Sequence, residues 1–230
     1  QLEKLADAIA ADFLISVWLV DSGIKVIDEP QGQRTLLEVL PTEATPADKS
    51  VAAFCQQCYP LFGDNQAAQF GEIDLICPCC HGEQRLTSGQ KALTLSDIKA
   101  MATQLISQGS LELTCEGVQF SLTPFTDSST RPQLLICNPN TLNAHFCLKD
   151  HQVLALSSIE KPLICARPTQ EHDKLTAPLY DICFGYSRVV LVLAEVLRQK
   201  GIDWIYLQGQ HHRPQLAWVD GAWAQLFSQD

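Results

Sequence analysis

The chain of 230 residues is 46% hydrophobic and 18% charged, and its 26 acidic and 16 basic side chains give a formal net charge of -10. This apolar content excludes a disordered protein and suffices for one large domain, or for two to three small ones with their own cores. The acidic balance and the lack of a Lys and Arg run disfavour a nucleic-acid partner, because binding phosphates needs a basic surface. No apolar run reaches the roughly 18 residues of a membrane span, so no membrane partner is expected.

The first segment, residues 1–46, is predicted to form a small α/β unit. Apolar residues recur at helical spacing at its start and are then followed by strand-like runs over 13–20 and 23–27. The sequence Asp21-Ser-Gly23 between the two runs is a turn signal. A short helix is expected over 33–40, and the Pro-containing stretch 41–46 has the composition of a linker.

The second segment, residues 50–88, contains the most specific motif of the chain. Its cysteines are spaced Cys-Gln-Gln-Cys, eighteen residues, Cys-Pro-Cys-Cys. Each Cys-x-x-Cys pair can place two thiolates on one tetrahedral metal ion, and the segment has few long apolar runs with which to form a core. We therefore predict one zinc ion, structural because four thiolates leave no open coordination position, with these ligands: Cys55, Cys58, Cys77 and Cys80.

Other interpretations of these cysteines stay open at the sequence level. Disulfides at the same positions are one alternative, and a redox-active Cys-x-x-Cys is a weaker one, because two pairs are present and neither opens a clear helix. Cys79 is an alternative ligand to Cys80, although Cys80 preserves the two-residue spacer. The remaining cysteines occur singly and are expected to be reduced and packed in cores, which favours a cytoplasmic protein: Cys115, Cys137, Cys147, Cys165 and Cys183.

The third segment, residues 89–230, alternates between helix and strand patterns. A helix is predicted from an N-cap at Ser96 to Gly109, with an apolar face of Ile98, Ala102, Leu105 and Ile106. The other predicted elements are strands over 111–115, 118–122, 133–137, 162–166 and 204–207, a helix over 189–199 closed by Gly201, and a hairpin over 216–226 that turns at Asp220-Gly221.

The order of these parts resembles the family of the hydrogenase maturation carbamoyltransferase HypF. In that family an acylphosphatase-like domain precedes cysteine fingers with the spacing found here, and a YrdC-like domain and a large carbamoyl-transfer domain follow. The resemblance implies an α+β or α/β protein with three parts. These are an acylphosphatase-like remnant (1–46), a four-cysteine zinc finger (50–88) and a YrdC-like α/β domain with a mixed sheet (89–230).

Outside the finger, the sequence departs from the catalytic motifs of that family. Trp18-Leu-Val-Asp21 falls where the family has Trp-Val-x-Asn, so a carboxylate stands where the resemblance places the catalytic amide. The segment Arg131-Pro-Gln-Leu-Leu-Ile-Cys137 falls where the family has its basic Lys-Arg-x-x-x-Lys-Pro segment, and most of the basic residues that hold a nucleotide are missing. The resemblance thus implies a relative that kept the scaffold and lost the chemistry.

Two functions follow as hypotheses. The first is a non-catalytic, zinc-stabilised accessory or binding protein related to hydrogenase maturation, which acts through a protein partner. The alternative is a nucleotide-dependent carbamoyl or acyl transferase, with Lys99, Arg131 and Lys161 as the candidate nucleotide-binding residues. A zinc-ribbon nucleic-acid binder is a weaker third reading, because the sequence shows no basic face.

Overall fold

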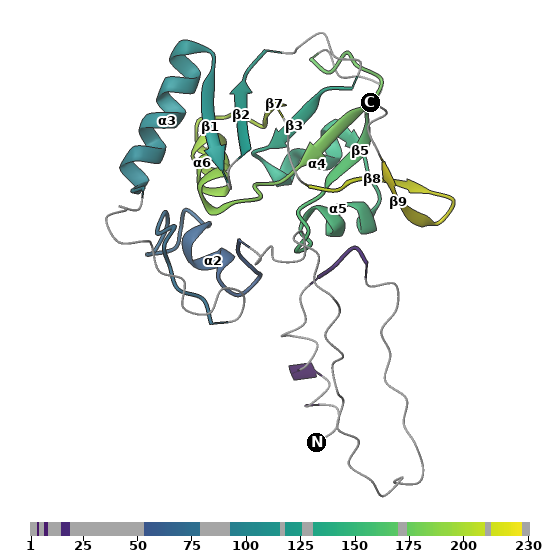
Figure 1. The fold of residues 1–230 in the computed structure, drawn as a ribbon, viewed down its shortest axis with the longest axis horizontal. Coiled ribbons are helices and arrows are strands. Elements are labelled where there is room, and N and C mark those ends of the chain that lie inside the picture. The colour runs from purple at the N-terminus through teal and green to yellow at the C-terminus, as the bar shows by residue number, and fades with distance from the viewer. Residues whose placement is uncertain are drawn as a thin grey trace, which may run out of the picture.

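The computed structural model describes residues 4, 7, 8, 15–18, 53–78, 93–115, 118–125, 131–169, 174–209 and 213–226 (Figure 1). Most elements predicted for residues 1–46 lie outside these ranges. The strand predicted over 13–20 is wrong where it can be checked, because residues 15–18 form coil and a turn. Their backbone groups bond a distant loop instead of a neighbouring strand, since Ile159 N donates to Ile15 O at 2.8 Å and Val17 N to the Glu160 carboxylate at 3.2 Å.

The described residues form a mixed sheet with helices on both faces. The helices are α2 (Tyr59–Phe62), α3 (Leu95–Gln108), the short 3-10 turn η2 (Pro139–Thr141), α4 (Leu142–His145), α5 (Asp150–Leu156) and α6 (Arg188–Gln199). The strands are β1 (Leu111–Cys115), β2 (Val118–Thr123), β3 (Gln133–Ile136), β4 (Phe146–Cys147), β5 (Leu163–Pro168), β6 (Tyr180–Cys183), β7 (Trp204–Gly209), β8 (Gln215–Val219) and β9 (Ala222–Leu226).

The strand order in the sheet is β1-β2-β7-β3-β6-β5-β8-β9, and β4 pairs with β5 off this path. The pairs β3–β6 and β5–β8 are parallel and the others are antiparallel. The late strand β7 therefore lies between β2 and β3, although β2 and β3 follow one another in sequence. A mixed sheet was predicted, and it is confirmed.

Alternating side chains of the central strands build two separate cores. One face, with Leu135 and Cys183, packs against α3, α6 and the cysteine segment that contains α2; the other, with Leu134 and Ile182, packs beneath α4 and α5. Figure 1 shows α3 and α6 at one side of the sheet, α2 below them and α5 away from that group. Within the described residues, no helix is both long and apolar enough to cross a membrane.

The helix predicted before the first hairpin is present, with two corrections. Its N-cap is Thr94 rather than Ser96, because the Thr94 hydroxyl accepts from Asp97 N at 3.3 Å and the Asp97 carboxylate accepts from Thr94 N at 2.8 Å. Ile106 was predicted on the apolar face but is 49% exposed. Gly109 ends the helix in the left-handed conformation (φ 76°) as predicted.

Most predicted strands of the third segment are present, and the terminal hairpin turns at Asp220-Gly221 with both residues at positive φ. Strand β6 and helix α5 were not predicted. Among the single cysteines, Cys137 and Cys183 are buried as expected, whereas Cys147 is exposed. Cys147 points away from the core because its neighbour in the two-residue strand β4, Phe146, takes the inward position.

Candidate metal centre and adjoining cavity

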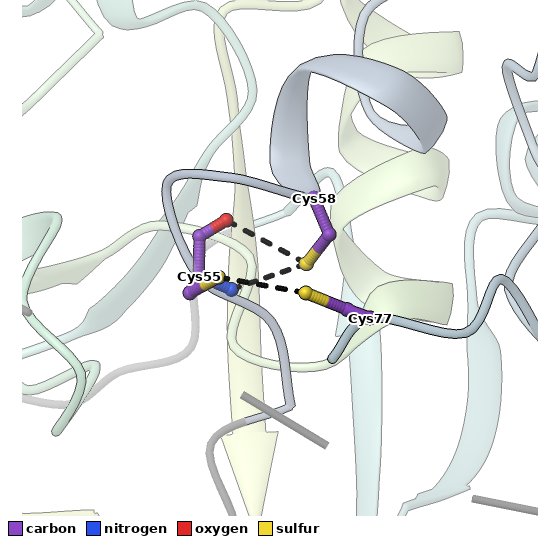
Figure 2. Close-up of side chains that lie close together, drawn as sticks. All are labelled: Cys55, Cys58 and Cys77. Carbon is purple, nitrogen blue, oxygen red and sulfur yellow. Dashed lines mark hydrogen bonds between the residues drawn. The ribbon is translucent and has the colours of Figure 1, made fainter. Parts of the chain in front are cut away.

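The candidate metal centre is built on turns and one short helix. Cys58 is the N-cap residue of α2, and Cys55 lies one turn before it, where its carbonyl accepts from Tyr59 N at 2.9 Å. Cys77 returns from the far end of the segment and points its sulfur at Cys55 (Figure 2). All three side chains are buried.

The three sulfur atoms lie within 4.8 Å of one another, and the sulfurs of Cys55 and Cys77 are 3.9 Å apart. With zinc–sulfur bonds of about 2.3 Å, tetrahedral geometry places two thiolates roughly 3.8 Å apart. The Cys55–Cys77 separation therefore fits a shared metal ion, and it is far longer than the about 2.05 Å of a disulfide bond. All three cysteines are free thiols, against the disulfide interpretation at these positions.

The fourth predicted ligand, Cys80, and its alternative Cys79 lie outside the described residues. The structure thus brings together three of the four cysteines selected from the sequence. These three thiols form a possible metal-binding cluster.

Arg188, at the first position of α6, fastens the cysteine segment to the sheet domain. Its guanidinium donates to the carbonyl oxygens of Ala53 and Ile73 at 3.0 Å each, and also to that of Leu75. It lies over the ring of Phe62 at 4.8 Å and donates to the Cys58 sulfur at 3.9 Å. A donor to a metal-binding sulfur orients the thiolate and offsets its charge.

Sequence reasoning missed Arg188. Position 188 directly follows Ser187, whose hydroxyl accepts from Val190 N and caps α6. A charged residue at the start of an apolar helix ordinarily faces solvent, so no local pattern marked it. Its five fixed donors suit three carbonyl groups from two stretches of the chain, around residue 53 and at 73–75, and these groups meet only after folding.

A cavity of about 300 Å³ lies beside the metal centre. Its walls come from five parts of the molecule: Ile15 near the N-terminus, the cysteine segment, α6, the ends of β3 and β6 with the loops that follow them, and the turn before β5. Representative lining residues are Phe54, Tyr59, Ile136, Phe184, Leu191 and Ala194. The cavity is therefore lined mainly by apolar side chains and closes only when the cysteine segment sits on the sheet domain.

Lys161, one of the three residues predicted to bind a nucleotide, lies in the wall of this cavity. Its ammonium donates to Ser157 O at 3.0 Å and lies 4.5 Å from the centre of the Phe54 ring. Burial lowers the pKa of Lys161 to about 8, and the nearby Glu160, Cys55 and Cys58 oppose that shift. Its backbone is left-handed, with φ 46°.

The other two predicted nucleotide-binding residues are placed elsewhere. Lys99 is exposed on α3. Arg131 precedes β3 and forms an ion pair with Asp181, a buried carboxylate on β6 whose pKa is raised by burial and lowered by Arg131, the first effect being larger. Neither residue is among those lining the cavity, so the structure does not bring the three cations together.

No protein-family model matches the sequence, and no curated protein matches it. Two solved structures do. Full-length HypF in its phosphate- and nucleotide-bound form is 13% identical with a TM-score of 0.42, over 67% of this chain and 22% of that one. HypF of T. kodakarensis is 12% identical with a TM-score of 0.43, over 78% of this chain and 30% of that one. The likeness is distant and concerns the fold, and the chain spans less than a third of either protein.

Proposed function

We propose that this chain is a zinc-binding, non-catalytic accessory protein related to hydrogenase maturation. The observation that carries the proposal is the convergence of three buried thiols, Cys55, Cys58 and Cys77, within bonding reach of one ion. Cys80 completes a four-thiolate site in this proposal. Zinc fits a buried all-sulfur donor set, because soft thiolates at tetrahedral spacing favour it over calcium or magnesium.

The role proposed for zinc is structural. Four thiolates fill its coordination sphere, so the ion would cross-link the cysteine segment and leave no position for a substrate. The relation to hydrogenase maturation rests on the cysteine spacing and on the order of the parts in the sequence. A protein partner and a cytoplasmic location belong to the same proposal, the latter because reduced thiols persist there.

Metal analysis tests the zinc site. Purified protein is expected to contain one zinc ion per chain by mass spectrometry of the metal content, and Cys77→Ser is expected to lose most of it. Cys147→Ser is the matched control, because Cys147 is a reduced cysteine on the surface. Wild-type protein without stoichiometric zinc, purified without chelator, would refute the proposal.

The non-catalytic part needs a separate assay. We expect no hydrolysis of acyl phosphates and no ATP consumption that depends on carbamoyl phosphate. Turnover near the usual 1–10³ per second of enzymes would overturn this part and leave the zinc site untouched.

The alternative function, a nucleotide-dependent carbamoyl or acyl transferase, is favoured by one observation, the cavity with Lys161 in its wall. An active site of this kind would use the cavity for its substrate. Calorimetric titration with ATP separates the two functions, since the transferase requires binding that weakens in Lys161→Met. Absence of binding in zinc-containing protein excludes it.

A further inference from the structure

The cavity beside the metal centre has the chemistry of a binding site in its own right. Phe54, Gln56 and Tyr59 of the cysteine segment line it together with Leu191 and Ala194 of α6, and Ile136 and Phe184 line it at the ends of β3 and β6. Concave sites with largely apolar walls and a few polar groups are typical of small-molecule binding. The walls favour an apolar or aromatic body for the occupant.

The charges on the wall set the charge of the occupant. Glu195 also lines the cavity, but Arg198 holds its carboxylate through two hydrogen bonds of 2.7 Å each, so its charge is offset. The ammonium of Lys161 forms no ion pair within the described part of the chain; its hydrogen bond goes to a neutral carbonyl, and it lies 4.5 Å from the centre of the Phe54 ring. Glu160, Cys55 and Cys58 are close enough to act on its charge, but none of them is paired with it. One of its three donors is thus used by Ser157 O, and a ligand can take the others.

The backbone at Lys161 indicates that the cation is retained at a cost. A left-handed conformation costs an ordinary residue on the order of 1 kcal/mol and is tolerated best by Gly and Asn. Lysine occupies it at φ 46°, directly before the buried strand β5. Strain of this kind is common where a side chain is positioned for function.

We propose that this cavity binds a small apolar or aromatic molecule with a single negative charge, such as an arenecarboxylate, and that Lys161 is its counter-ion. One cation in an apolar wall balances one anionic group, whereas a triphosphate requires several. The walls join the cysteine segment to the sheet domain, so the ligand touches both. This inference depends neither on the identity of the metal nor on the maturation role.

Calorimetry on the full chain with 1-naphthoate, its neutral analogue 1-naphthamide and ATP tests the proposal. We expect 1-naphthoate to bind with 1:1 stoichiometry and Lys161→Met to weaken it about thirtyfold or more, as for a desolvated charge pair. Lys161→Asn should weaken it as much while leaving thermal stability equal or higher, because Asn accepts the left-handed conformation. Lys200→Met, an exposed lysine at the end of α6, is the matched control and should bind within about twofold of wild type.

A steric variant locates the ligand. Ala194→Leu adds volume to the wall and should weaken 1-naphthoate while circular dichroism and zinc content stay unchanged. The proposal is overturned if 1-naphthoate does not bind, if 1-naphthamide binds as tightly, or if Ala194→Leu has no effect. ATP binding that depends on Lys161, without 1-naphthoate binding, also overturns it and supports the transferase. Zinc content, measured on the same samples, shows separately whether the metal site holds.

Discussion

The cysteine segment and the sheet it packs on are stabilised in different ways. Over residues 53–78 the regular structure is one four-residue helix, and the backbone hydrogen bonds are local turns such as Ala67 N to Asp64 O and Gly71 N to Phe62 O. The sheet is held by continuous ladders and two cores. Turns of this kind cannot offset the entropy of ordering such a segment, so its order must come from side chains.

Three side-chain devices supply that order: the thiol cluster, the Arg188 hydrogen bonds, and the burial of Phe54 and Phe62 in the same core as α3 and α6. The comparison shows how a segment without a core of its own is ordered by packing into the core of a larger domain. It also predicts that the two regions respond separately to perturbation.

The largest effect is expected from metal removal. Chelation should abolish hydrogen-exchange protection in residues 53–78, with a loss of at least about 3 kcal/mol, since structural zinc binds small domains with about 10–16 kcal/mol. Strands β3 and β6 should stay protected and act as the internal control. Parallel loss of protection in both regions would show one cooperative unit, and no loss in either would show that the metal is not structural.

A smaller effect is expected from Arg188→Met. The substitution removes charge-assisted hydrogen bonds to the carbonyls of Ala53 and Ile73, worth about 1.5–3 kcal/mol each, and we expect a total loss near 3 kcal/mol because such terms are not additive. Hydrogen exchange of residues 53–78 measures it, since no tryptophan lies in that segment to report by fluorescence. Arg198→Met is the matched control and should cost less than about 1 kcal/mol, because Arg198 bonds a neighbour on its own helix. Equal losses of stability in the two variants would show that the Arg188 hydrogen bonds to the cysteine segment contribute no more than the Arg198–Glu195 pair.

The smallest effect is expected on the pH dependence of stability and comes from Asp181 in the sheet. Burial raises the pKa of Asp181 above its ordinary value despite the ion pair with Arg131. Over the pH range between the ordinary pKa of Asp and the raised pKa, the Asp181 carboxyl is protonated in the folded state and ionised in the unfolded chain. Asp181 therefore lowers the free energy of unfolding as pH rises through that range. A tenfold change in the acid constant corresponds to about 1.4 kcal/mol.

Asp181→Asn should flatten that part of the profile, because the amide does not titrate, and it should not lower stability at neutral pH, where burial disfavours the charged carboxylate. Unfolding free energies of both proteins between pH 4 and 7 measure the difference. Identical pH slopes would show that Asp181 does not titrate in this window. Protection of the cysteine segment should be unaffected by this change in the sheet.

The sequence predicted those features that depend on short-range patterns. Cys-x-x-Cys spacing identified Cys55, Cys58 and Cys77, the apolar period located α3 and α6, and the pair Asp220-Gly221 marked the hairpin. Strand β6 was missed because its four residues, all buried, follow a Pro-containing stretch and show no alternation. Local patterns cannot reveal such a strand, whose hydrogen-bonding partners are distant in sequence.

The sequence predicted the proximity of Cys55, Cys58 and Cys77 and did not predict their surroundings. Arg188 contributes through carbonyls more than a hundred residues away, and the cavity exists only between elements from both regions. The three predicted nucleotide-binding cations were chosen by residue type, and of these Lys161 lies in the cavity wall. The positive charge of a residue does not by itself indicate whether its side chain lies at a binding site in the folded protein.

The place of β7 has a consequence for how the protein forms. Among the strands that the structure describes, β7 alone joins the hairpin of β1 and β2 to the rest of the sheet, since β7 pairs with β2 on one side and β3 on the other. During synthesis, the hairpin and β3 thus wait for residues 204–209 before they join. The thiols of the proposed zinc site are all synthesised by residue 80, whereas α6, the surface that receives the segment, appears more than a hundred residues later. Metal binding would then precede docking, and slow non-local pairing would limit the rate of folding.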